Sequence, residues 1–145
     1  MAARERSPVS MSDIVVFDTS VLVDQIRTNR HIDRMLKIEA VIRNCAVVFA
    51  ELWRGASTPT DRRVIEVLER NYPTFTPTEK NWIESGRILS KIQADKGFEP
   101  RKLRDLHFDV LIALTIRSHG ACLITSNRDD FELIRTYRDF QLEVW

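Results

Sequence analysis

The chain has 145 residues, of which 43% are hydrophobic and 30% charged, and this composition excludes a collagen-like or wholly disordered protein. The 22 basic residues nearly balance the 21 acidic ones, so the net charge is +1. This balance excludes a strongly basic nucleic-acid coat but allows a local basic groove. The length predicts a single domain of residues 13–145 behind a polar tail of residues 1–12, in which Met11 is an alternative start.

The cellular compartment is indicated by the cysteines and the N-terminus. Cys45 and Cys122 lie far apart in apolar runs, which is typical of buried free thiols in a reducing compartment. The polar N-terminus lacks the apolar stretch of a secretory signal, and no apolar run approaches the roughly 20 residues that cross a membrane. We therefore expect a cytoplasmic protein that has no contact with a membrane.

The first half of the chain alternates apolar runs with helical patterns. Residues 14–17 are apolar at consecutive positions, which predicts a strand covered on both faces, as in a parallel sheet. A helix is expected from Val21, and a second from about residue 29 to residue 42. Residues 45–49 predict another buried strand, which leads into a helix over residues 50–55.

The next segment carries helix start and stop signals. Thr58-Pro59 predicts a helix with proline at its first position. Thr76-Pro77-Thr78-Glu79 predicts a capping box, with Thr76 as N-cap and Glu79 at N3, and the helix that follows is expected to end near Gly97. Residues 99–104 are expected to form a charged connection.

The last third completes the alternation of strands and helices. A helix is predicted over residues 105–119, a buried strand over 121–124, a short helix over 130–137 and an edge strand over 142–145. This order predicts an α/β domain with a mostly parallel sheet.

Acidic residues follow each of the first three predicted strands. Asp18 directly follows the first, Glu51 follows the second, and Asp129 and Asp130 follow the third. Because ligands of open α/β sheets bind beyond the carboxyl ends of the strands, we expect these side chains to lie near one edge. Asp109 lies early in the helix that leads into the third strand, and the pattern alone does not place it in the site.

Carboxylates that share an edge predict a cation site, because like charges raise one another's pKa unless a cation offsets them. An oxygen-only cluster suits Mg²⁺ or Mn²⁺ rather than zinc, and such ions often bind phosphate oxygens, which indicates phosphodiester or phosphoryl transfer. Each acid also has a simpler interpretation. Asp18 and Asp130 could be helix N-caps, Glu51 a first-turn acid favoured by the helix dipole, and Asp109 a partner of Arg104 or a solvated residue.

Four blocks of sequence match one family. They are residues 15–22 (VVFDTSVL), residues 50–52 (AEL) with Gly55, residues 109–113 (DVLIA), and Gly120 followed by residues 123–127 (LITSN) and Asp130-Phe131. With these blocks in this order, the sequence resembles PIN-domain proteins, and within them the VapC-like toxins of bacterial toxin–antitoxin modules. The blocks cover most of the chain.

The resemblance implies a three-layer α/β/α PIN fold and a metal-dependent ribonuclease that uses Mg²⁺, with Mn²⁺ as a possible substitute. It also places Asp109 in the site. The implied catalytic and metal-binding acids are Asp18, Glu51, Asp109 and Asp130. Asp18 and Asp109 would hold one Mg²⁺, and the other two would complete the cluster or a second site. The doublet of residues 129–130 leaves open which side chain faces the metal.

Supporting roles are also implied by the resemblance. Thr19 or Ser20 would orient Asp18 or a metal-bound water, and Thr125 and Asn127 belong to the fourth block. Asp105 is a supporting candidate whose alternative is a solvated or arginine-paired side chain. The implied reaction is hydrolysis by metal-activated water, which leaves a 5′-phosphate and a 3′-hydroxyl.

The implied partners are an RNA substrate, a VapB-like antitoxin and a second copy of the chain. Basic residues near the acids are expected to contact RNA phosphates, with a solvated charged loop as the alternative. These residues are Arg54, Arg101, Lys102 and Arg104. Early apolar side chains are expected to form a groove for an antitoxin helix, with a plain core as the alternative. They are Leu22, Ile26, Ile32, Met35 and Leu36.

Two other functions stay open at this point. One is a PIN-domain nuclease of RNA processing that works without an antitoxin. The other is a non-catalytic binding module that retains the fold, and the intact set of acids counts against it.

Overall fold

The structure is a computed structural model that describes residues 13–145. The predicted tail of residues 1–12 and the alternative start at Met11 lie outside the described residues. One sheet contains β1 (Ile14–Phe17), β2 (Val41–Cys45), β3 (Thr74–Phe75), β4 (Cys122–Thr125) and β5 (Gln141–Val144). The strands lie in the order β3-β2-β1-β4-β5, and every neighbouring pair is parallel.

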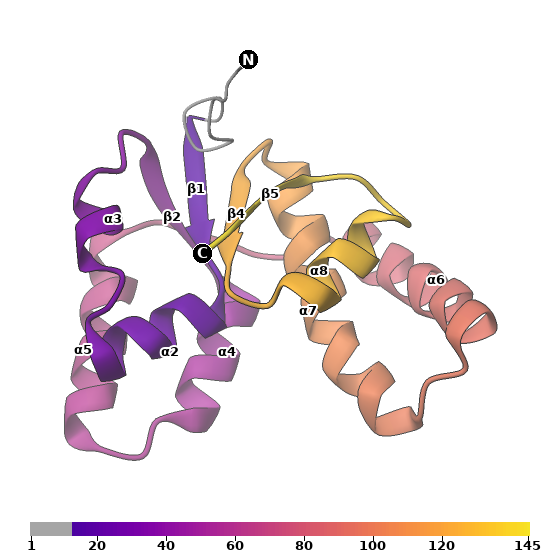
Figure 1. Cartoon of the computed structure of the whole chain (residues 1–145), viewed down its shortest axis with the longest axis horizontal. Coiled ribbons are helices and arrows are strands. Elements are labelled where there is room, and N and C mark those ends of the chain that lie inside the picture. The colour runs from indigo at the N-terminus through magenta and orange to yellow at the C-terminus, as the bar shows by residue number, and fades with distance from the viewer. Residues whose placement is uncertain (1–12) are drawn as a thin grey trace.

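Helices connect the strands and cover both faces of the sheet. They are α2 (Thr19–Thr28), α3 (Ile32–Leu36), α4 (Ala46–Gly55), α5 (Pro59–Asn71), α6 (Glu79–Lys96), α7 (Pro100–Ser118) and α8 (Arg128–Arg135). Because crossovers between parallel strands are right-handed, helices that follow β1 and β2 lie on the opposite face from those that follow β3 and β4. In Figure 1, α2, α3 and α5 lie to the left of the strands, and α6, α7 and α8 lie to the right. The predicted three-layer α/β/α fold is confirmed.

The sheet has a switch point between β1 and β4. From β1 the chain proceeds to β2 and β3 in one direction, and it then returns to add β4 and β5 on the other side of β1. At such a point the loops that follow the two neighbouring strands diverge, and a crevice forms beyond their carboxyl ends. Asp18 follows β1 there, and residues 126–127 follow β4.

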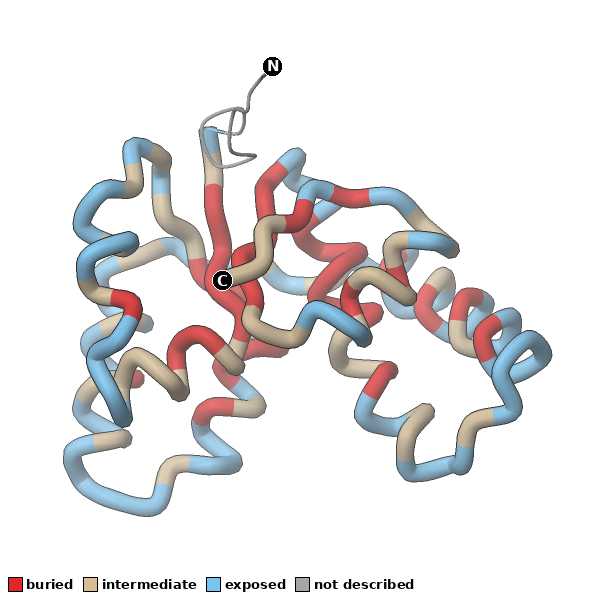
Figure 2. Tube along the Cα trace, viewed as in Figure 1, coloured by how far each residue is buried: buried red, intermediate tan, exposed pale blue. Residues whose placement is uncertain are grey.

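The core lies between the central strands and α7. Val15, Val16 and Leu123 are fully buried in the sheet. In α7, every residue from Val110 to Ile116 is buried, and Figure 2 shows this segment in red beside the central strands. Both cysteines are buried and free, as predicted. Within residues 13–145, no helix combines the length and the apolarity that a bilayer-spanning segment needs.

β2 differs from its prediction. Only the first residue of the predicted strand 45–49 belongs to β2, and the others form the first turn of α4. That turn is apolar because Val47, Val48 and Phe49 are all buried. A helix buried on several sides is as apolar as a buried strand, so periodicity could not separate the two. The predicted helix of residues 29–42 is also too long, because α3 ends at Leu36 and β2 starts at Val41.

The start of α6 lies two residues beyond the predicted N-cap, Thr76. Thr78 is the N-cap: its Oγ1 accepts a hydrogen bond from the Asn81 backbone N–H at 3.0 Å, and Asn81 Oδ1 accepts one from the Thr78 N–H at 3.0 Å. The capping box thus has asparagine at N3 where the usual pattern has glutamate or glutamine. The predicted end of the helix is confirmed, because Gly97 adopts the left-handed conformation with φ 64°.

α7 starts earlier than predicted. Pro100 is its first residue, so the segment 99–104 is not a connection but the N-cap and first turns of the helix. Its high charge hid the helical pattern, because these turns project beyond the core. The consequence is that Lys102 and Asp109 lie on one continuous helix.

Candidate active site

Asp18 is the buried acid at the switch point. Its side chain is 4% exposed, and its Oδ2 accepts hydrogen bonds from Thr125 Oγ1 at 2.8 Å and from Ser20 Oγ at 2.9 Å. Asp18 is the N-cap residue of α2, as the simpler interpretation predicted, but its side chain makes no capping hydrogen bond and instead binds the two hydroxyls. Burial raises the pKa of Asp18, and the two hydroxyl hydrogen bonds oppose that rise.

Hydrogen bonds join the loops after β1 and β4. The Ser126 backbone N–H donates to Ser20 Oγ at 3.0 Å, and the Asn127 N–H donates to Thr125 Oγ1 at 2.9 Å. The same two hydroxyls bind Asp18, so they fix this carboxylate relative to both strands.

Glu51 comes to the site from α4. It lies beyond the first turn of that helix, so it is not a first-turn acid, and its Oε1 accepts a hydrogen bond from Thr19 Oγ1 at 2.6 Å. Thr19 therefore holds Glu51, whereas Ser20 orients Asp18. Burial, followed by the negative charge of Asp18, raises the pKa of Glu51, and the Thr19 hydrogen bond and the Arg54 charge act in the opposite direction.

Asp109 lies in the middle of α7 and is electrostatically coupled to the other three acids. Burial, followed by the charges of Asp18, Glu51 and Asp130, raises its pKa to about 8, while Lys102 acts to lower it. These charge interactions mean that Asp109 lies near the acids that follow β1 and β4. The interpretation as a partner of Arg104 finds no support, because no ion pair between the two forms within the described part of the chain.

Asp130, on the first turn of α8, is held by two donors. Lys102 Nζ contacts its Oδ1 at 2.7 Å, and Asn127 Nδ2 donates to its Oδ2 at 3.2 Å. Asn127, not Asp130, occupies the N-cap position of α8. Asp129 is exposed, so Asp130 is the member of the doublet that faces the other acids.

The four carboxylates match the chemistry of a hard divalent cation. As the side chains lie, no three Asp, Glu, His or Cys groups within residues 13–145 converge on one point where a metal ion could bind. Each of Asp18, Glu51 and Asp130 is instead held by a hydroxyl, amide or ammonium donor. The donor set is nevertheless all oxygen, and the charges of Asp18, Glu51 and Asp130 add to burial in raising the pKa of Asp109. These properties fit Mg²⁺ or Mn²⁺.

The weaker candidates lie around the four acids. Asp105 is exposed, one turn before Asp109, and its charge acts on Glu51. The guanidinium of Arg54 lies 5.4 Å from the centre of the Phe108 ring. Arg101 and Arg104 are exposed on the first turns of α7, so they are accessible to a ligand that approaches the site.

Sequence reasoning missed the contact between Lys102 and Asp130. Lys102 was expected to contact RNA, and the ion pair was not anticipated. The available signal was Pro100, which marks the first turn of a helix. With the helix started there, Lys102 and Asp109 are seven residues apart, which is about two turns, and they share a face.

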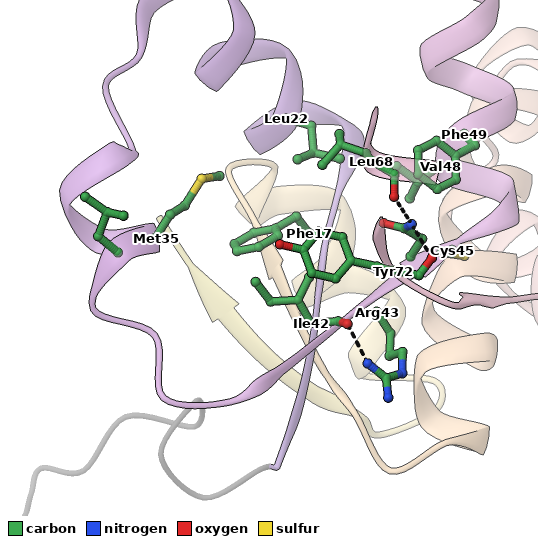
Figure 3. A pocket seen from close by; sticks show the side chains of 12 residues that line it. Phe17, Leu22, Met35, Ile42, Arg43, Cys45, Val48, Phe49, Leu68 and Tyr72 are labelled. Atoms are coloured by element: carbon green, nitrogen blue, oxygen red, sulfur yellow. Dashed lines mark hydrogen bonds between the residues drawn. The ribbon is translucent and has the colours of Figure 1, made fainter. Parts of the chain in front are cut away.

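A separate apolar groove lies near the N-terminal helices (Figure 3). It encloses about 230 Å³, and side chains from β1, β2, α2, α3, α4 and α5 line it. Three of the five predicted groove residues, Leu22, Met35 and Leu36, belong to its lining, whereas Ile26 and Ile32 do not. Figure 3 shows Met35 extending from α3 toward Phe17. Leu36 is 77% exposed, so this part of the surface is not core.

The fold and the site define a three-layer α/β/α domain with an acidic site at the switch point of a parallel sheet. A family model of the PIN domain matches residues 15–137 of the sequence. The chain belongs to the PIN-domain family, and the resemblance found in the sequence is confirmed. Comparison with curated protein sequences gives no significant match.

Several solved structures share the fold. A chain of VapBC-1 from nontypeable Haemophilus influenzae is 24% identical with a TM-score of 0.67, and the match covers 91% of this chain and 98% of that one. A chain of VapBC2 from Rickettsia felis, solved with a promoter DNA fragment, is 20% identical with a TM-score of 0.68 over 91% and 98%. VapBC-5 from Mycobacterium tuberculosis, a member of a toxin–antitoxin family, matches at 20% identity and a TM-score of 0.60 over 92% and 99%.

Proposed function

We propose that this chain is a metal-dependent endoribonuclease and the toxin of a VapBC-type toxin–antitoxin pair. The observation that carries the proposal is the match of the PIN-domain family model to residues 15–137, in a fold where Asp18 and Asp130 follow the two strands of the switch point. The four acids come from four different connections between the strands, and the charges of the other three act on Asp109. The structural likeness to chains of VapBC toxin–antitoxin systems supports the toxin assignment.

The acids are the proposed ligands of Mg²⁺, which Mn²⁺ could replace. When bound, the ion activates water for attack and offsets charge on the phosphate. The chain's own contribution is to hold the carboxylates in place: Ser20 and Thr125 bind Asp18, and Thr19 binds Glu51. Such pre-arrangement lowers the cost of ordering the ligands when the cation and the substrate bind.

Basic side chains around the acids are the proposed contacts for the RNA backbone. Arg101 and Arg104 are exposed on the first turns of α7, and Arg54 lies close enough to act electrostatically on Glu51. Contacts of this kind bind phosphates irrespective of sequence and weaken as salt is added.

The proposed test of the nuclease is cleavage of a structured RNA pool by the purified protein with Mg²⁺, with Mn²⁺ and with EDTA. We expect cleavage with either ion, none with EDTA, and products with 5′-phosphate and 3′-hydroxyl ends. Cleavage that persists in EDTA, or products with 2′,3′-cyclic phosphates, would contradict the proposed chemistry, because those ends require the 2′-hydroxyl as the nucleophile. No cleavage of any RNA by folded protein would favour a binding module.

The antitoxin is the proposed occupant of the apolar groove. An amphipathic helix presents apolar side chains at intervals of three and four residues, which suits a groove lined by Leu22, Met35 and Leu36. A homodimer is proposed as well, supported by Trp82 and Ile83, neighbouring apolar residues of α6 that are 50% and 52% exposed.

A charged substitution in the groove tests antitoxin binding separately from RNA cleavage. We expect Leu36→Asp to weaken binding of a VapB-like antitoxin by at least about tenfold, because a carboxylate would be desolvated in the interface. RNA cleavage by the variant should be unchanged, since Leu36 does not belong to the acidic site. Val67→Asp is the matched control: Val67 is 38% exposed on α5 and does not line the groove. Equal loss of antitoxin binding in both variants would contradict the groove assignment.

A further inference from the structure

Lys102 is in direct contact with the acidic site. Its Nζ lies 2.7 Å from Asp130 Oδ1, while Asn127 Nδ2 occupies the other carboxylate oxygen at 3.2 Å. Within residues 13–145, the contact between Lys102 and Asp130 is the only ion pair within 4.0 Å that involves one of the four acids. Both oxygens of Asp130 are thus engaged by donors from the chain itself.

The position of Lys102 on α7 gives its charge a wider influence. It lies seven residues before Asp109 on the same helix, so the two side chains share a face about two turns apart. Its positive charge favours the ionised form of Asp109, which three neighbouring carboxylates disfavour. Lys102 therefore partly offsets the negative charge at Asp109 and Asp130.

The Lys102–Asp130 contact is accessible to solvent, so the ammonium can leave the carboxylate. The side chain of Lys102 is 38% exposed and that of Asp130 is 22% exposed, so water reaches the pair. Lysine carries its charge on a flexible four-carbon stem and forms no rigid bidentate contact, so the ammonium can withdraw from the carboxylate without a change in the backbone.

We propose that Lys102 is a built-in counter-ion of the acidic site, which competes with the divalent cation for Asp130 and thereby sets the metal affinity. This inference rests on the proposed function only in taking the acids as a metal site. It adds a counter-ion role for Lys102, which is not itself a metal ligand. In the metal-free protein the ammonium stabilises a cluster of like charges. When the cation binds, the ammonium must give up Asp130.

Two opposite effects of removing the charge follow from this role. Lys102→Met keeps most of the length of the side chain but removes the ammonium, so the metal-free protein loses an attraction and becomes less stable. The cation then meets no competitor and binds more tightly. A residue that merely positioned Asp130 for the metal would give the reverse result for binding.

The test is calorimetric titration of Mg²⁺ and of Mn²⁺ into the full chain without RNA, together with thermal unfolding in EDTA. Lys102→Met should lower the Kd for the cations roughly fivefold and lower the Tm in EDTA. Lys102→Arg, which keeps the charge and can bind a carboxylate with two nitrogens, should bind the cations no more tightly than the wild type. Arg101→Met is the matched control, because it removes the same charge from the neighbouring exposed position and should also leave the Kd within about twofold.

The outcomes separate this inference from the nuclease assignment. Equal or weaker metal binding by Lys102→Met would overturn the counter-ion role while leaving the metal site intact. An equal gain in affinity for Arg101→Met would reduce the effect to general charge and would also overturn it. Absence of binding in every variant would overturn the metal site, and the inference with it. Tighter binding by Lys102→Met without RNA cleavage by the wild type would support the inference and contradict the nuclease.

Discussion

The acids of the site depend on their immediate donors. Asp18 is buried yet accepts hydrogen bonds from two hydroxyls, while Glu51 accepts one from Thr19. Asp109 has three carboxylates as electrostatic neighbours, and burial is the largest cause of its raised pKa. Sequence reasoning could select Asp18 and Glu51 from their place after the strands. It could not assign Thr19 to Glu51, because that contact joins residues 32 positions apart.

The raised pKa of Asp109 predicts how stability depends on pH in EDTA. The pKa of an aspartate is about 3.9 in the unfolded chain, against about 8 in the folded protein. Between these values the folded state binds more protons than the unfolded state, so the free energy of unfolding should fall as pH rises from about 4 to about 8. Asp109→Asn should flatten this fall and raise the Tm at pH 8, as measured by thermal denaturation over that range.

The control for this measurement is Asp129→Asn, which removes an exposed carboxylate next to the site. It should retain the pH dependence of the wild type. An unchanged pH profile in Asp109→Asn would contradict the account of a buried, mutually repelling cluster.

At the scale of elements, α7 connects the core to the site. Its residues 110–116 are buried, and its first turns carry Lys102, which pairs with Asp130, together with the exposed Arg101 and Arg104. The strands β1 and β4 and the end of α6 were predictable, because continuous apolar runs and a glycine stop are local signals. The position of β2 along the chain and the start of α7 could not be predicted. Tertiary packing makes the first turn of α4 apolar, and the first turns of α7 extend beyond the core.

Because the centre of α7 is buried, a cavity there should strongly lower the free energy of unfolding. Leu111 is fully buried, so Leu111→Ala should lower the free energy of unfolding by about 2–5 kcal/mol in a denaturant titration. Ile83→Ala, on the exposed side of α6, should cost less than about 1 kcal/mol. Similar losses for the two variants would contradict the packing described for α7.

At the scale of the whole molecule, the order of the strands creates the site. The chain returns after β3 to add β4 on the other side of β1, so the loops after β1 and β4 diverge and leave room for Asp18 and Asp130 at one edge. The alternation of strands and helices predicted a parallel sheet, but the strand order could not be derived from it. The place of Asp109 came from the family resemblance, because a helix that packs along the sheet can present a carboxylate at either end.

The proposed role of the acids in catalysis can be measured as the rate of RNA cleavage at saturating Mg²⁺ by the wild type, Asp109→Asn and Asp129→Asn. Asp109→Asn should lose at least about 100-fold in rate, because it removes a ligand charge without disturbing the fold. Asp129→Asn, one residue from Asp130 but exposed, should cleave like the wild type. Full activity of folded Asp109→Asn would contradict the assignment of the acidic cluster as the catalytic site.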